Sequence, residues 1–226
     1  MEVTFYGHSS FLIEVSGKKI LFDPFISPND KAKEIDIETI EADYIFVSHG
    51  HEDHVADVVS IAKRTGAMVV SNFEVITWFQ NKGLENVHPM NHGGSKTFDF
   101  GKVKYVSAIH SSTMPDGSAG GNPGGFVVQT EGKVFYYAGD TALTYDMKLI
   151  GEAFEIDFAF LPIGDNFTMD IHDAIKASEF VGTNKFFGMH YYTFPYIEIS
   201  EEKVKKAASD AGKELIMLNI GGKITL

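Results

Sequence analysis

The chain contains no cysteine, so disulfide bonds, thiolate metal ligands and cysteine nucleophiles are all excluded. It also has a single arginine, Arg64, and therefore no array of guanidinium groups that could grip phosphates or carboxylates through paired hydrogen bonds. The net charge of −12 at pH 7 argues against a protein that binds nucleic acid through a basic face. Positive charge at a functional site is therefore expected to come mainly from bound metal, helped by any lysines that the fold places nearby.

Long apolar runs are also missing from the sequence. None approaches the ~20 apolar residues that a membrane-spanning helix needs, and residues 1–5 lack the basic region and apolar core of a secretory signal. We therefore expect a cytoplasmic protein that binds no membrane, which the absence of cysteine also suits. The 226 residues, 44% of them apolar, suffice for a single domain over residues 1–226 with a sizeable core.

Hydrophobic periodicity and turn residues predict a chain rich in short strands. These strands are expected over residues 3–6, 10–15, 19–22, 44–47, 68–70, 98–100, 103–109, 126–130, 134–137, 158–161, 186–189 and 214–218. Helices are expected over residues 55–64, 74–81, 144–154, 172–181 and 201–211, the last with Ser200 as its N-cap. Hairpins are expected about Gly101 and about Glu131-Gly132. In each half strands come first and then alternate with helices, which predicts two related halves forming two packed sheets with helices on their outer faces.

Four potential metal ligands are gathered in one short segment directly after the apolar stretch 44–47. The segment reads Ser48-His49-Gly50-His51-Glu52-Asp53-His54. Histidine is the commonest metal ligand and aspartate supplies a hard anionic oxygen. Functional sites often form at strand ends, so three histidines and one aspartate at this position indicate one part of a metal site. The alternative is a solvated turn that is merely rich in histidine.

Three further metal-capable residues follow apolar strands in the same way. His110 ends the strand expected over 103–109, Asp140 comes shortly after 134–137, and His190 ends 186–189. A single histidine or aspartate after a strand usually belongs to a capped turn. Its recurrence after several strands favours a shared metal site. We expect these strand ends to converge.

The pattern His49-x-His51-x-Asp53-His54, followed by His110, Asp140 and His190, resembles the five-part ligand pattern of the metallo-β-lactamase superfamily. The resemblance runs over essentially the whole chain. Asp23, in Leu21-Phe22-Asp23-Pro24, is similar to that superfamily's first motif, an aspartate that usually supports the site without binding metal. The resemblance implies an α+β fold, the αββα sandwich, which agrees with the pattern of strands and helices.

A narrower likeness points to the compact branch of the superfamily described only as metal-dependent hydrolases. It rests on Gly7-His8-Ser9-Ser10, His110-Ser111-Ser112, Gly139-Asp140-Thr141 and His190-Tyr191-Tyr192-Thr193-Phe194-Pro195. This branch is similar to the ascorbate-6-phosphate lactonases and, more distantly, to the N-acyl-phosphatidylethanolamine phosphodiesterases.

The resemblance implies two divalent metal ions as cofactors. One would be held by His49, His51 and His110, and the other by Asp53, His54 and His190, with Asp140 bridging both. Zinc is the default for such ligands, and carboxylate-containing sites also accept manganese or iron. Redox chemistry of the flavodiiron kind is disfavoured, because those proteins place Glu where His51 stands and need an electron-carrying domain.

A dinuclear site of this kind indicates a metal-dependent hydrolase. Two cations roughly 3.5–4 Å apart lower the pKa of a bound water toward about 7, and the resulting hydroxide attacks a carbonyl carbon or a phosphorus. Asp53 is a candidate catalytic residue that would orient this hydroxide as well as bind metal. We expect cleavage of an ester, lactone or phosphodiester bond of a small cytosolic metabolite. The alternative is a metal-dependent binding or sensing protein with little turnover, and a homo-oligomer remains open.

Residues next to the ligand pattern are candidates for supporting roles. His8 follows a strand and is a second candidate catalytic residue, as a proton donor or substrate contact; the alternative is a buried histidine bonded to the backbone. Substrate contacts are expected from Tyr191, Tyr192, Thr193 and Asn166.

The glycine-rich segment 117–125 lacks the features of a phosphate-binding loop. We expect a mobile loop over the metal site, with a long connection as the alternative. His172, His88 and His92 are expected to be solvated surface groups.

Overall fold

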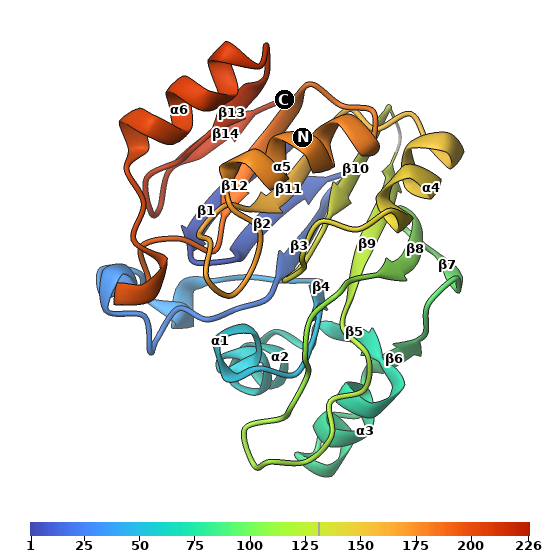
Figure 1. Cartoon of the computed structure of the whole chain (residues 1–226). Helices are drawn as coiled ribbons and strands as arrows, with labels where there is room; N and C mark the ends of the chain where they lie inside the picture. Colours follow the sequence, from blue (N-terminus) through green and yellow to red (C-terminus); the bar gives the residue numbers. More distant parts are fainter. Residues whose placement is uncertain (131) are drawn as a thin grey trace.

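The computed structural model describes residues 1–130 and 132–226 and shows two seven-stranded β-sheets packed face to face (Figure 1). The first sheet has the order β14-β1-β2-β3-β4-β5-β6 and the second the order β13-β12-β11-β10-β9-β8-β7. The strands of the first sheet are β1 (Glu2–Gly7), β2 (Ser10–Val15), β3 (Lys18–Phe22), β4 (Tyr44–Phe46), β5 (Met68–Asn72), β6 (Val87–Met90) and β14 (Lys223–Thr225). Those of the second are β7 (Ser95–Phe98), β8 (Gly101–Ser107), β9 (Gly124–Thr130), β10 (Lys133–Tyr137), β11 (Phe158–Pro162), β12 (Lys185–Met189) and β13 (Glu214–Ile216).

Both sheets follow the same plan of strand directions. In the first, β1 to β3 are antiparallel neighbours and β3 to β6 are parallel. In the second, β7 to β10 are antiparallel and β10 to β13 are parallel. Consequently β1, β3 and β4 all end at one edge of the first sheet, and β8, β10 and β12 all end at one edge of the second.

Helices cover the outer faces of the two sheets in the described part of the chain (Figure 1). On the first sheet, the short α1 (Glu52–Val55) precedes α2 (Val58–Thr65), and α2 and α3 (Phe73–Asn81) pack against β5. On the second, α5 (Ile171–Phe180) packs against β11 between α4 (Asp146–Ala153) and α6 (Glu201–Asp210). Short 3₁₀ helices cover Asp30–Ala32, Ile37–Thr39 and Pro195–Ile197. Every helix of the described residues is too short or too polar to cross a lipid bilayer.

Alternation along the central strands divides the apolar side chains between two cores. Phe22 and Phe46 point between the sheets, where their ring centroids lie 6.2 and 5.0 Å from that of Phe126. Their neighbours Leu21 and Ile45 point outward into the core shared with α2 and α3. Because successive side chains of a strand face opposite ways, a strand that is apolar at consecutive positions is buried on both faces.

The structure confirms the expected α+β sandwich and corrects one helix. The helix expected over residues 55–64 is interrupted, since α1 ends at Val55 and α2 begins at Val58. Asp57 lies at the break, and its carboxylate accepts hydrogen bonds from the backbone N–H groups of Ile26 and Ser27 at 2.6 and 2.9 Å. A tertiary contact therefore ends the helical run.

Two strands at the edges of the first sheet, β6 and β14, are absent from the sequence prediction. The first of them contains His88, which is partly buried instead of being a solvated turn residue. Gly101 begins β8 instead of forming the centre of its hairpin. The other hairpin turn is predicted about Glu131-Gly132, and Glu131 lies outside the described residues.

Candidate metal centre

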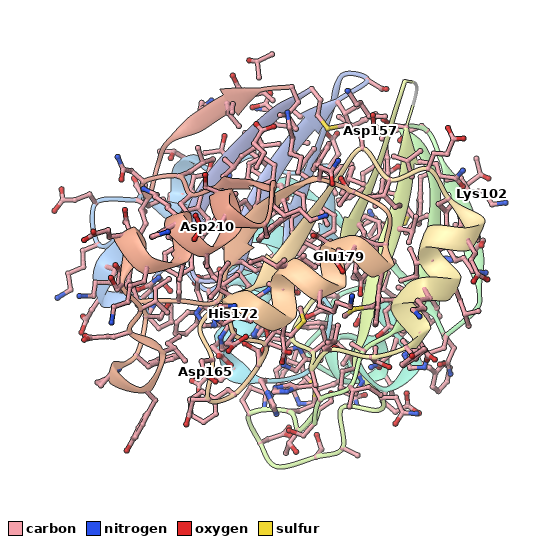
Figure 2. All side chains as sticks on the ribbon, turned by 45° about the horizontal axis from the view of Figure 1, so that its top comes forward. Lys102, Asp157, Asp165, His172, Glu179 and Asp210 are labelled. Atoms are coloured by element: carbon pink, nitrogen blue, oxygen red, sulfur yellow. The ribbon has the colours of Figure 1, made fainter. Side chains whose placement is uncertain are left out.

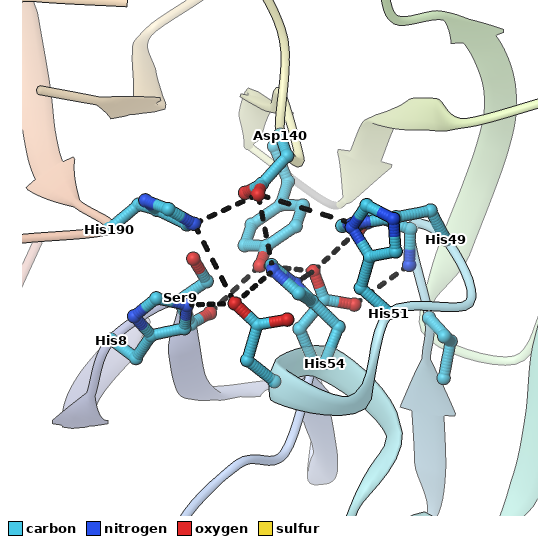
Figure 3. A network of polar contacts seen from close by, with 12 residues as sticks. His8, Ser9, His49, His51, His54, Asp140 and His190 are labelled. Atoms are coloured by element: carbon cyan, nitrogen blue, oxygen red, sulfur yellow. Dashed lines mark hydrogen bonds and ion pairs between the residues drawn. The ribbon is translucent and has the colours of Figure 1, made fainter. Parts of the chain in front are cut away.

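The metal-capable residues gather where strands of both sheets end (Figure 3). Four of them follow β4 and three follow β8, β10 and β12: His49, His51, Asp53 and His54, then His110, Asp140 and His190. The structure thus brings together all seven residues of the expected ligand set, and their binding of metal stays a prediction.

His49, His51 and His110 form a first group, with ligand nitrogens within 4.8 Å of one another. Nε2 of His49 lies 3.0 Å from Nδ1 of His51. His49 is fully buried, whereas His51 and His110 are partly exposed. The group therefore has one side inside the protein and one side that a dissolved molecule can reach.

Asp53, His54 and His190 form a second group, which His8 joins. Oδ2 of Asp53 lies 3.8 Å from Nε2 of His54 and 3.8 Å from Nε2 of His190. The same oxygen lies 3.1 Å from Nε2 of His8. The two groups correspond to the two ion positions that the resemblance implies.

Asp140 lies between the two groups. Its Oδ2 is 2.9 Å from Nε2 of His190 and 3.3 Å from Nε2 of His54. It is also 3.6 Å from Nε2 of His110 and 4.0 Å from Nε2 of His49. A single carboxylate oxygen thus approaches ligands of both groups, as a bridging residue would.

The buried Oδ1 of Asp140 has no hydrogen-bond partner within residues 1–130 and 132–226, and the buried Nε2 of His54, although 3.3 Å from Oδ2 of Asp140, makes no hydrogen bond of good geometry there. Leaving a buried polar atom unpaired costs about 1–3 kcal/mol, so such atoms usually have a ligand, ion or water beside them. Imidazole nitrogens and carboxylate oxygens are the donors that zinc, manganese and iron accept. The residues therefore fit bound metal, and the number of ions stays a prediction.

The electrostatics of the cluster favour a cation. Burial, helped by the nearby His54, lowers the pKa of His49 well below its ordinary value. Burial opposes ionisation of Asp140, but His190 and His54 outweigh it and hold the pKa of this carboxyl well below its usual range. Burial also favours a neutral His54, yet neighbouring carboxylates, Asp140 first, raise its pKa well above the ordinary value. A proton and a metal ion therefore compete for His54, while neutral His49 and ionised Asp140 are ready to bind metal.

Asp23 binds the segment that carries the metal-capable histidines through hydrogen bonds on its buried side. Its fully buried carboxylate accepts hydrogen bonds from Nδ1 of His54 at 2.9 Å, from the hydroxyl of Tyr137 at 2.8 Å, and from the backbone N–H and hydroxyl of Ser48 at 2.7 and 2.6 Å. With Nδ1 occupied in this way, His54 presents Nε2 to the metal position, which is how a carboxylate orients a metal-binding histidine. The sequence pointed to Asp23 but not to Ser48 or Tyr137, whose roles depend on packing between the sheets.

His8 is buried and bonded to side chains on both ring nitrogens, against the alternative of a backbone-bonded histidine. Nδ1 lies 2.8 Å from Oγ1 of Thr193, and Nε2 faces Asp53. Burial, with His190 nearby, lowers the pKa of His8 to about 4. The ring is therefore neutral at pH 7 and held in one orientation.

Three of the four residues expected to contact substrate share one cavity, and Asn166 is not among the residues that line it. Tyr191, Tyr192 and Thr193 line a cavity of about 450 Å³ that also borders His8. Asn166 is exposed, and its backbone N–H donates to the carboxylate of Asp165 at 2.7 Å. Their contact with substrate stays a prediction.

His172 lies exposed at the start of α5, as expected (Figure 2). His92 is more enclosed than the sequence suggests. Its ring stacks on Tyr105 with centroids 5.0 Å apart, and its Nε2 lies 2.8 Å from the carbonyl oxygen of Pro123.

The segment between His110 and β9 packs beside the histidine loop. The hydroxyl of Ser112 accepts from the backbone N–H of Gly50 at 3.0 Å and donates to the carbonyl of Gly120 at 2.9 Å. The side-chain amide of Asn72 also donates to the carbonyl of Gly120, at 2.7 Å. These contacts favour a fixed connection over a loop that lies across the metal position.

An aromatic groove of about 600 Å³ opens beside Asp53. We use this name for the surface lined by the rings of Phe25, Phe167, Phe194 and Tyr196 together with Pro28, Pro195, Glu52 and Asp53. Sequence reasoning missed it, because its rings come from three loops, after β3, β11 and β12, that meet only in the folded chain.

Comparison with known proteins identifies the class. The family model described as "Beta-lactamase superfamily domain" matches residues 2–190. A UPF0173 metal-dependent hydrolase of Flavobacterium johnsoniae is 58% identical over 226 residues, covering 100% of both chains. The chain is therefore a metal-dependent hydrolase of the metallo-β-lactamase superfamily. Within it, the chain belongs to the UPF0173 family of metal-dependent hydrolases.

Solved structures agree with this assignment. The structure of Igni18, a metallo hydrolase from the archaeon Ignicoccus hospitalis, is 33% identical, with a TM-score of 0.90 and coverage of 100% of this chain and 97% of that chain. YhfI from Bacillus subtilis, a metallo-β-lactamase fold protein, is 16% identical, with a TM-score of 0.75 and coverage of 99% and 98%. The second likeness shows the fold alone, and it confirms the expected metallo-β-lactamase-like fold.

Proposed function

We propose that the chain hydrolyses an ester, lactone or phosphodiester bond of a small cytoplasmic metabolite, using two divalent metal ions, most readily Zn²⁺. The observation that carries the proposal is the position of Asp140, with Oδ2 between two ligand groups and a buried Oδ1 that has no partner within the described residues. The acidic chain with one arginine supports a small substrate over a nucleic acid.

The bound ions would lower the pKa of a water molecule toward about 7 and polarise the substrate oxygen that gains negative charge. His49, His51 and His110 would hold one ion, and Asp53, His54 and His190 the other. Asp140 would span both.

Asp53 has a second role in the proposal. Asp53 lines the aromatic groove and also belongs to the ligand cluster, so its carboxylate would orient the attacking water and accept its proton as the new bond to the substrate forms. His8 lies 3.1 Å from Oδ2 of Asp53, and Thr193 fixes the opposite side of the His8 ring. His8 therefore keeps the Asp53 carboxylate in place.

A screen of chromogenic esters, lactones and phosphodiesters tests this function. Protein loaded with zinc or manganese should turn over at least one class faster than the free ion does, and chelation should abolish turnover until metal is restored. Asp53→Asn should lose activity by a factor of about 10² or more. Asp99→Asn, which changes an exposed carboxylate between β7 and β8, should keep it. Absence of turnover on every class, with tight binding of one metabolite, would instead support a binding or sensing protein.

A further inference from the structure

The aromatic groove leads directly to the metal centre. Asp53 lines the groove and belongs to the second ligand group, so a molecule lying in the groove is next to the reacting position. The inner wall is fixed by packing on His8, whose ring centroid is 5.7 Å from that of Phe25 and 5.5 Å from that of Phe194. The groove therefore borders the centre, and its inner rings are packed on His8.

The outer wall consists of two rings that the fold leaves in solvent. Phe167 is 50% exposed and Tyr196 is 74% exposed, with ring centroids 6.1 Å apart in an edge-to-face arrangement. They come from different loops, one after β11 and one after β12. Neighbouring exposed aromatic rings at the mouth of a site form the kind of apolar surface that marks ligand contact.

The backbone before each of these rings is left-handed. Asp165 and Asn166, directly before Phe167, have φ values of 62° and 55°, and Tyr192, in the loop that leads to Tyr196, has φ of 64°. Asp and Asn tolerate this conformation, whereas tyrosine rarely adopts it, and such strain clusters at ligand clamps and active sites. The loop that carries Tyr196 is thus held in an unfavourable conformation at the place where a substrate would enter.

The charge of the groove selects among substrates. Its described lining contains two carboxylates, Glu52 and Asp53, and neither lysine nor arginine. Lys31 lines the separate cavity beside Tyr191 instead. Asp53 would be neutralised as a metal ligand, so the negative charge of the groove itself comes from Glu52. An anionic substituent placed there would lose hydration and find no cationic side chain, whereas an aryl or alkyl group would bury apolar surface against the rings.

We propose that the aromatic groove binds an uncharged aryl or long alkyl group of the substrate, adjacent to the bond that is cleaved. The preferred substrates are then esters or lactones with an apolar tail, in preference to compounds with a phosphate or carboxylate tail. This inference rests on the proposed function, because the metal centre must hold the reacting group. Phe167 and Tyr196 are its specificity-determining residues.

Three hydroxamates that share one metal-binding head group test the inference by calorimetry on metal-loaded protein: acetohydroxamate, 4-phenylbutyryl hydroxamate and succinyl monohydroxamate. The phenyl tail should strengthen binding about tenfold over the methyl group, and the carboxylate tail should weaken it. Phe167→Ala and Tyr196→Ala should each remove most of the phenyl preference and leave acetohydroxamate binding unchanged. Phe73→Ala and Tyr145→Ala, which truncate rings that are 60% and 73% exposed outside the groove, serve as matched controls.

The outcomes separate the inference from the proposed function. Equal affinities for the three tails, or equal effects of groove and control variants, would overturn the inference and leave the metal centre intact. If the protein takes up no metal and none of the three compounds binds, the metal centre and the inference fall together. If metal is bound and none of the three compounds binds, the inference alone is overturned.

Discussion

Single residues that hydrogen-bond to the candidate ligands or to their loop determine how those ligands are oriented. Asp23 is the main example, since one buried carboxylate orients His54 and fixes the backbone at Ser48. Its own backbone has φ of 40°, a left-handed value that costs of order 1–3 kcal/mol in residues other than glycine. Such a conformation persists only where surrounding contacts maintain it.

Asp23→Asn should weaken metal binding by about 10- to 100-fold. One of the groups that donate to the Asp23 carboxylate, such as Nδ1 of His54, would then face an amide N–H₂ group instead of an acceptor oxygen. Competition with a chromogenic chelator measures this affinity. Asp57→Asn is the matched control, since Asp57 is equally buried and accepts backbone hydrogen bonds outside the centre. Equal losses of affinity in the two variants would show that Asp23 acts only through general stability.

Gly50, inside the histidine loop, is the second residue on which the site depends. A Cβ at this position would overlap Sδ of the buried Met114 and lie 3.3 Å from Oγ of Ser112. A side chain at residue 50 would therefore force the side chain of Met114 to move from its present position beside the loop.

Gly50→Ala should destabilise the protein by about 1–3 kcal/mol through overpacking. Adding Met114→Ala should relieve the overlap, so that the double variant loses at least about 0.5 kcal/mol less than the sum of the single variants. Urea unfolding of the three variants gives these free energies. Strictly additive changes in the free energy of unfolding would mean that an added side chain at residue 50 does not overlap Met114.

At the scale of elements, Asn72 joins α3 to the glycine-rich segment. Its Oδ1 caps α3 by accepting from the backbone N–H of Val75 at 2.8 Å, while its Nδ2 donates to the carbonyls of Gly120 and Asn122 at 2.7 and 3.2 Å. One side chain thus starts a helix and anchors the connection beside the metal centre.

Asn72→Ser should keep the cap but remove both donors, leaving the Gly120 carbonyl with fewer partners at a cost of about 1–3 kcal/mol. Limited proteolysis should then cut within residues 110–123 faster than in the parent protein. Ser200→Ala, which removes the predicted and observed N-cap of α6, is the control. It should cost about 1 kcal/mol without opening that segment, and equal proteolysis of the two variants would refute the anchoring role.

Elements with a local signal are predictable from the sequence, and those fixed by distant contacts are not. The strand Ser10–Val15 has its predicted bounds, because its apolar run and turn are contiguous. The break before α2 depends on Asp57 reaching the loop at Ile26, which no local pattern reveals. The strand Val87–Met90 contains Pro89, which reads as a turn but is tolerated at the edge of a sheet.

The same distinction applies to the candidate site. His110 and His190 are predictable because each follows an apolar strand, and strands that share a direction deliver their ends to one edge. Phe167 and Tyr196 are not, since their proximity arises only once β11 and β12 lie side by side.

For the whole molecule, the centre joins the two halves. The histidine loop belongs to the first sheet, whereas His110, Asp140 and His190 belong to the second. Ions held between them would link the sheets at one edge of the sandwich and bind only the folded chain.

Metal should therefore stabilise the whole fold. At a free-ion concentration of 100 times Kd each bound ion contributes about 2.7 kcal/mol, so two ions give about 5.4 kcal/mol and a rise in Tm of about 11–22 °C for a chain of this size. Calorimetry before and after chelation measures the change. The rise should shrink in His110→Ala and persist in His172→Ala, which removes an exposed histidine outside the cluster. An unchanged Tm after removal of bound metal would contradict a link between the sheets.

Elemental mass spectrometry of protein purified without a metal-affinity tag tests the central claim most directly. We predict about two equivalents of divalent metal per chain, and a clear loss of metal in His51→Ala with none in His172→Ala. Fewer than about one equivalent in the parent protein, with the same amount in His51→Ala, would contradict the existence of the metal centre.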